Sequence, residues 1–108
     1  MSIAGRAAVM TTAGADLQIR EYPVIGPTPG AILVRVTCCT ICRSDLWSWT
    51  GRRPAATPLI LGHEIVGRVV ALGAGVSHDA RDRQLTLGDR ISWTITDSCG
   101  RCYFCREA

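Results

Sequence analysis

The stretch GHEIVGRVVALG (residues 62–73) decides how this chain folds. From Ile65 onward it is an apolar run, interrupted only by Gly67 and Arg68 and ended by Gly73. Such a run is typical of a short strand in a β domain. His63 and Glu64 stand immediately before that run, and imidazole and carboxylate groups are both good zinc ligands. The stretch therefore predicts a strand that carries metal-binding side chains at its start.

Segments on either side of this stretch also alternate apolar and polar residues, as strands do. They are LQIREYPV (17–24), AILVRVTC (31–38) and GDRISWTITD (88–97). One short helix is expected in CRSDLWSWTG (42–51), with Ser44 or Asp45 as its N-cap and Gly51 as its end. Short strands, turns rich in glycine and proline, and little helix predict a mainly β fold, either a small barrel or a sandwich.

Composition limits the possible classes of protein. A chain of 108 residues is one domain's worth, and 47% hydrophobic with 19% charged residues is typical of a soluble globular protein. No apolar run is long enough for a membrane span or a signal peptide, so we expect a cytoplasmic protein without membrane contact. All 12 basic residues are arginine, but a net charge of +3 is too small to indicate a nucleic-acid partner.

A cysteine upstream of the decisive stretch completes a possible zinc site. Cys42 follows one expected strand and His63 precedes another, so a barrel could bring the thiolate, His63 and Glu64 together. Three protein ligands with an open position are what a catalytic zinc needs. Taken alone, however, a single cysteine and a single histidine are more often a core thiol and a hydrogen-bonded imidazole.

A second set of possible ligands lies downstream, where Cys99, Cys102 and Cys105 follow one another at intervals of three residues. A structural zinc takes four protein ligands, so this triplet is one ligand short. The six cysteines of the chain could instead form the disulfides of a secreted protein, but the triplet spacing favours metal ligation. The other two, Cys38 and Cys39, are expected to be buried thiols, and His78 to be exposed in a polar loop.

These motifs, in this order, resemble the medium-chain, zinc-dependent alcohol dehydrogenase family. The resemblance is carried by GHE (62–64) with its spaced glycines, by CRSD (42–45), and by GDRISW (88–93) leading into the cysteine triplet. It implies a GroES-like, partly open β-barrel. Residues 1–108 would be the incomplete N-terminal catalytic domain of a two-domain enzyme, and the Rossmann dinucleotide-binding domain has no counterpart in this chain.

The resemblance also implies two zinc ions. Cys42 and His63 would hold the catalytic zinc, with Glu64 as a further ligand or just behind the metal. Cys99, Cys102 and Cys105 would hold a structural zinc. The fourth structural ligand would be a cysteine shortly after Cys105, and the remaining catalytic ligand would also lie beyond residue 108.

Three neighbours of Cys42 would have roles in catalysis or cofactor binding. Ser44 would relay the proton of the alcohol, although it could simply cap the helix. Asp45 would orient the zinc-bound histidine. Arg43 would contact the pyrophosphate of NAD or NADP, although it could be an ordinary exposed arginine. Trp47 departs from the pattern, because well-known members often carry a relay histidine there.

The activity implied is that of an NAD(P)-dependent alcohol dehydrogenase (EC 1.1.1.-), which passes hydride between an alcohol and the matching aldehyde or ketone. The full-length enzyme would be a homo-oligomer, and the 108-residue piece alone would be inactive. The segment 79–93 and the cysteine lobe also resemble a branch associated with phosphonate catabolism, and Arg52 and Arg53 would suit an anionic substrate.

Two other readings compete with the dehydrogenase. One is a non-enzymatic, zinc-bearing barrel that acts as an interaction module, since a fold alone does not establish a function. The other is a zinc-free relative of the quinone-reductase type, which would lack these ligands. The pairing of CRSD (42–45) with GHE (62–64) favours the enzyme, because an interaction module has no need of an open-sided metal site.

Overall fold

The computed structural model describes residues 3–107. Six strands and two short helices follow one another along the chain: β1 (Ala4–Met10), β2 (Gln18–Pro23), β3 (Ile32–Thr40), α1 (Arg43–Trp49), β4 (Leu59–Ile60), β5 (Glu64–Leu72), β6 (Arg90–Ser92) and α2 (Tyr103–Glu107). The prediction of a mainly β fold is confirmed. No helix among the described residues is long and apolar enough to cross a membrane.

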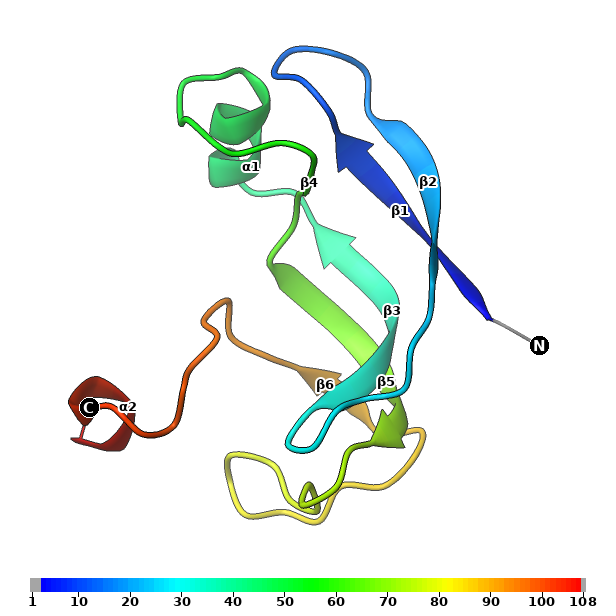
Figure 1. Cartoon of the computed structure of the whole chain (residues 1–108), viewed down its shortest axis with the longest axis vertical. Coiled ribbons are helices and arrows are strands. Elements are labelled where there is room, and N and C mark those ends of the chain that lie inside the picture. Colours follow the sequence, from blue (N-terminus) through cyan, green and yellow to red (C-terminus); the bar gives the residue numbers. More distant parts are fainter. Residues whose placement is uncertain (1–2, 108) are drawn as a thin grey trace.

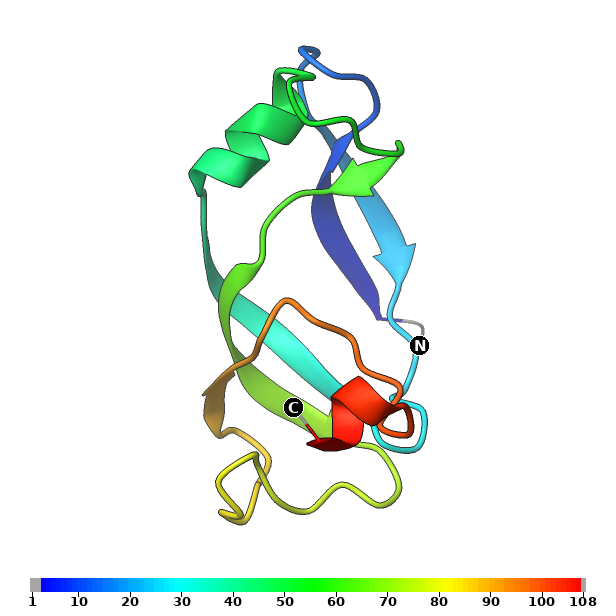
Figure 2. The same cartoon turned by 90° about the vertical axis from the view of Figure 1, so that its left-hand side faces the viewer.

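The strands form two antiparallel sheets of three, in the orders β2-β1-β4 and β3-β5-β6. Figure 1 shows β1 and β2 at the upper right and β3, β5 and β6 below them, with α1 at the upper left and α2 set apart at the lower left. After a quarter turn the sheets lie on opposite sides of the molecule, joined at the top by α1 and β4 (Figure 2). This arrangement is a partly open barrel.

The barrel is more open than a closed domain of its length. Its radius of gyration is 15.9 Å, whereas a compact chain of this size has about 13 Å. Only four hydrophobic side chains are buried among the described residues, namely Val9, Met10, Val69 and Leu85. Large apolar side chains such as Ile19, at 68% exposure, face outward. The two sheets therefore leave much apolar surface uncovered.

Strand β1 was not predicted, although it holds the most buried residues. Alanines and glycine dominate it, so the sequence shows no contrast between an apolar and a polar face. Its burial comes from its central place, because it pairs with β2 on one side and with β4 on the other. Val9 and Met10, each 1% exposed, lie where β1 passes β4.

Strand β5 is the centre of the second sheet and corresponds to the apolar run that follows His63. It pairs with β3 along its whole length and with β6 over three residues. A side chain at Gly67 is impossible without movement, because a Cβ there would lie 2.3 Å from Val34 Cγ1 and 2.7 Å from the Arg35 carbonyl oxygen. The glycine at this position of the motif thus permits the close approach of β3.

Two expectations for this sheet were wrong. The strand expected through Asp97 ends at Ser92, because the chain then leaves β5 and runs toward α2, and Ile95 is 71% exposed. Cys38 and Cys39 are exposed, not buried. The β-propensity of their segment placed them correctly on a strand, but it does not determine how far they are buried.

Candidate metal centre

Helix α1 begins at Cys42, which is its N-cap in place of the predicted Ser44 or Asp45. The Cys42 thiol accepts a hydrogen bond from the Ser44 backbone N–H (3.3 Å), and the Cys42 backbone N–H donates to Asp45 Oδ2 (2.9 Å). This reciprocal pair is a capping box in which a sulfur replaces the usual hydroxyl. The predicted end is confirmed, since Gly51 follows the C-cap with a φ of 78°.

Two hydrogen bonds fix α1 against the turn between β1 and β2. The Trp49 indole N–H donates to the Ala15 carbonyl (2.8 Å), and the Gly14 backbone N–H donates to the Trp49 carbonyl (2.6 Å). Trp49 is therefore a structural anchor, which accounts for one of the three tryptophans. These contacts hold the C-terminal end of α1, the helix whose N-cap is Cys42.

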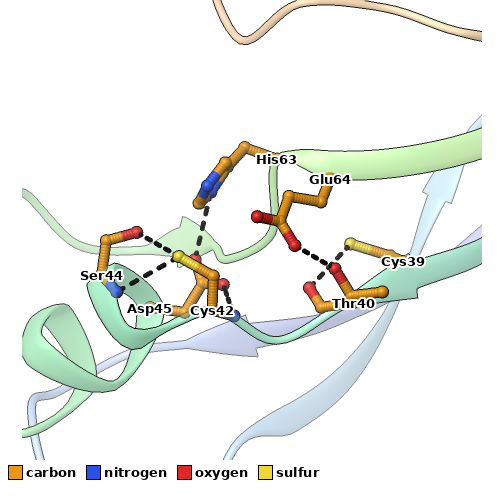
Figure 3. A network of polar contacts seen from close by, with 7 residues as sticks. All are labelled: Cys39, Thr40, Cys42, Ser44, Asp45, His63 and Glu64. Carbon is orange, nitrogen blue, oxygen red and sulfur yellow. Dashed lines mark hydrogen bonds and ion pairs between the residues drawn. The ribbon is translucent and has the colours of Figure 1, made fainter.

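The side chains of Cys42, His63 and Glu64 converge where β3 ends and β5 begins (Figure 3). One ligand atom from each residue lies within 4.8 Å of the other two. Zinc bonds of about 2.0–2.3 Å in a tetrahedron place ligand atoms roughly 3.5 Å apart, so only small side-chain adjustments are needed. Thiolate, imidazole and carboxylate are all zinc donors, and the residues therefore fit this metal.

Asp45 contacts two members of the cluster, Cys42 and His63. Its Oδ1 lies 3.5 Å from His63 Nδ1, and its Oδ2 accepts the bond from the Cys42 backbone. The Asp45 residue is 8% exposed, so these contacts are shielded from water. A carboxylate beside Nδ1 leaves Nε2 of His63 available to a metal, which is the usual arrangement of metal-binding histidines.

Replacing Asp45 with asparagine should weaken metal binding by ~10-fold or more, because carboxylates behind metal-binding histidines typically contribute ~10- to 100-fold. The amide oxygen of asparagine can still accept the helix-capping bond, so α1 should persist. Metal titration of Asp45→Asn and thermal unfolding of its metal-free form separate the two roles. Loss of stability without loss of metal affinity would show that Asp45 serves only as a helix cap.

The other residues expected to act near Cys42 have different surroundings. Ser44 Oγ lies 3.1 Å from Cys42 Sγ, so its hydroxyl is beside the cluster. Arg43 is the exposed first residue of α1. Sequence reasoning missed Thr40, whose hydroxyl donates a hydrogen bond to Glu64 Oε2. Only the pairing register of β3 with β5 could have revealed that contact.

The three downstream cysteines form a separate, exposed lobe around α2. Cys102 Sγ lies 3.3 Å from Cys105 Sγ, and Cys99 Sγ lies 3.8 Å from Cys105 Sγ. All six cysteines of the chain are free thiols. Hydrogen bonds from the backbone N–H groups of Arg101 and Cys102, followed by the neighbouring thiols, lower the pKa of Cys99 from 9.0 to about 7. Thiolate is the form that binds metal, so this lobe also fits zinc.

The second histidine of the chain, His78, belongs to the loop between β5 and β6. His78 is exposed, as predicted, and its Nδ1 is 2.8 Å from the hydroxyl of its neighbour Ser77. It takes no part in either group of possible metal ligands among the described residues.

Comparison with known proteins gives consistent matches. The sequence profile of the family described as alcohol dehydrogenase GroES-like domain matches residues 28–108. Over 103 residues the chain is 39% identical to an S-(hydroxymethyl)glutathione dehydrogenase of Synechocystis sp., covering 94% of this chain and 26% of that protein.

Solved structures agree with the sequence match. An alcohol dehydrogenase from Thermotoga maritima superposes with a TM-score of 0.84 at 32% identity, covering 97% of this chain and 29% of that one. Acetophenone reductase from Geotrichum candidum, in complex with NAD, gives a TM-score of 0.79 at 32% identity, covering 95% of this chain and 29% of that one. The chain thus spans between a quarter and a third of the length of these three proteins.

Proposed function

The chain belongs to the alcohol dehydrogenase GroES-like domain family, of the zinc-dependent, medium-chain type, and on that premise we propose that the protein carrying it is an NAD(P)-dependent alcohol dehydrogenase. Its substrates would be an alcohol and the corresponding aldehyde or ketone. One observation carries the proposal: side chains from two distant segments, Cys42 on one and His63 with Glu64 on the other, converge as a zinc-compatible cluster.

Zinc bound by these residues supplies Lewis-acid chemistry, which lowers the pKa of a hydroxyl group. The protein side chains around it orient the site and move the proton. Asp45 lies beside Nδ1 of His63 and would thereby leave Nε2 free to hold a zinc ion. Ser44, whose hydroxyl lies beside Cys42 Sγ, would relay the proton of the substrate alcohol, accepting it while passing its own hydroxyl proton on toward solvent. The indole of Trp47 is a donor only, so the onward proton path does not run through residue 47.

The remaining assignments concern the parts of the protein around this site. Arg43, exposed at the start of α1, contacts the cofactor pyrophosphate. Cys99, Cys102 and Cys105 hold a structural zinc together with a fourth ligand outside these 108 residues. Residues 1–108 form the GroES-like catalytic part, and a Rossmann domain elsewhere in a cytoplasmic, homo-oligomeric enzyme binds NAD or NADP. The much greater length of the matched proteins supports this division.

A chelation experiment on the full-length protein tests the proposal. Incubation with a panel of alcohols and either NAD or NADP should produce NAD(P)H, chelation should abolish this activity, and added zinc should restore it. Residues 1–108 alone should produce none, because they contain no glycine-rich dinucleotide turn. A full-length protein that retains zinc at Cys42 yet reduces neither cofactor would favour the non-enzymatic interaction module instead.

A further inference from the structure

The carboxylate of Glu64 has two oxygens in different surroundings. Oε2 accepts a hydrogen bond from the hydroxyl of Thr40, while the other oxygen points away from Thr40 toward Cys42 and His63 (Figure 3). Thr40 is thus the partner that determines which oxygen of Glu64 faces the cluster.

Strand pairing makes this contact possible. Thr40 and Glu64 are direct partners across the antiparallel pair β3 and β5, so their side chains leave the sheet on the same face. Thr40 is the last residue of β3 and Glu64 the first of β5. The hydroxyl therefore stands where the strand ends and the metal cluster begins.

A hydroxyl that donates to a carboxylate makes a charge-assisted bond, which is roughly twice as strong as a neutral one. While that bond lasts, Oε2 cannot turn to a metal, and the carboxylate has one oxygen left to offer. A carboxylate free of such a bond can bind through both oxygens or swing away, and Glu64 is exposed enough to do either.

We propose that Thr40 is a positioning residue for the metal centre: its hydroxyl holds Glu64 Oε2 at β3, so that Glu64 can bind the metal only through its other oxygen. Single-oxygen binding keeps the coordination number low and leaves a position open for substrate. This inference rests on the zinc site proposed above, and it assigns to Thr40 a role that none of the motif residues fills.

The test is a Co²⁺ titration of the full-length, metal-free protein, followed by visible absorption. The signal of Cys42→Ser, which retains the three-cysteine lobe, is subtracted to isolate the Cys42 site. Thr40→Val keeps the β-branched shape that suits a strand and removes only the hydroxyl. It should weaken Co²⁺ binding by ~10-fold, the lower limit typical of groups that support metal ligands, and should change the cobalt bands.

Three further variants make the result specific. Thr40→Ser keeps the hydroxyl and should restore wild-type binding. Thr37→Val, on the same strand, removes a hydroxyl that donates to the Val66 carbonyl (3.0 Å) and should have no effect. In a Glu64→Ala background the Thr40→Val change should cause no further loss, because its partner is gone.

Failure of the inference differs from failure of the zinc site. If wild-type protein gives no cobalt signal that depends on Cys42, the proposed zinc site is wrong, and this inference falls with it. If wild-type protein binds but Thr40→Val binds equally well, or if its loss persists in Glu64→Ala, the positioning role alone is overturned.

Discussion

Replacing His63 with alanine should remove the proposed zinc and reduce the proposed alcohol oxidation by the full-length protein to background. His63 supplies the imidazole of the candidate cluster, and without it only Cys42 and the exposed Glu64 remain among the described residues. Loss of the imidazole removes one of the protein ligands on which a catalytic zinc depends, and such a zinc needs three. Metal analysis of the purified variant and an assay of NAD(P)H formation measure the two losses.

His78→Ala is the matched control for this variant, because His78 is the other histidine of the chain and is exposed in the β5–β6 loop. It should retain wild-type zinc content and wild-type rates. Equal zinc loss in both variants would mean that the cluster does not bind the metal. Full activity of metal-free His63→Ala would contradict the zinc mechanism itself.

Replacing Gly62 with alanine should destabilise the protein by about 3 kcal/mol and lower its metal content, because two penalties coincide. The backbone at Gly62 has a φ of 112°, which side-chain-bearing residues rarely adopt. In addition, a Cβ there would lie 2.5 Å from Cys39 Sγ. Relief of that clash must move the backbone next to His63 or the end of β3. Urea unfolding and zinc analysis measure both effects.

Gly75→Ala separates the two penalties. Gly75 has a φ of 83°, but no atom within 4 Å of a new Cβ, so this variant should show the backbone strain alone, about 1–2 kcal/mol. Adding Cys39→Ala to Gly62→Ala removes the sulfur and should recover the difference. If Gly62→Ala is no more destabilising than Gly75→Ala, the contact with Cys39 is not what requires glycine at this position.

Local pattern was sufficient for much of the fold. The apolar run after His63 became β5, and the alternation in residues 31–38 became most of β3. Prediction from local pattern failed where the burial of a segment depends on the strands that pair with it. β1 carries no periodic signal, yet its last two residues, Val9 and Met10, are buried, whereas the alternating segment up to Asp97 leaves the sheet after Ser92.

The amino-acid sequence by itself determined the family and the types of donor atom in the two groups of candidate metal ligands. Donor types, and short spacings such as that from Cys99 to Cys105, are properties of the chain alone. Only the tertiary structure decided which distant groups meet. Cys42, rather than Ser44 or Asp45, caps α1, and the Thr40 hydroxyl reaches Glu64. The contact of Thr40 with Glu64 depends on the register of β3 against β5, where a shift of one residue would turn each side chain to the other face of the sheet.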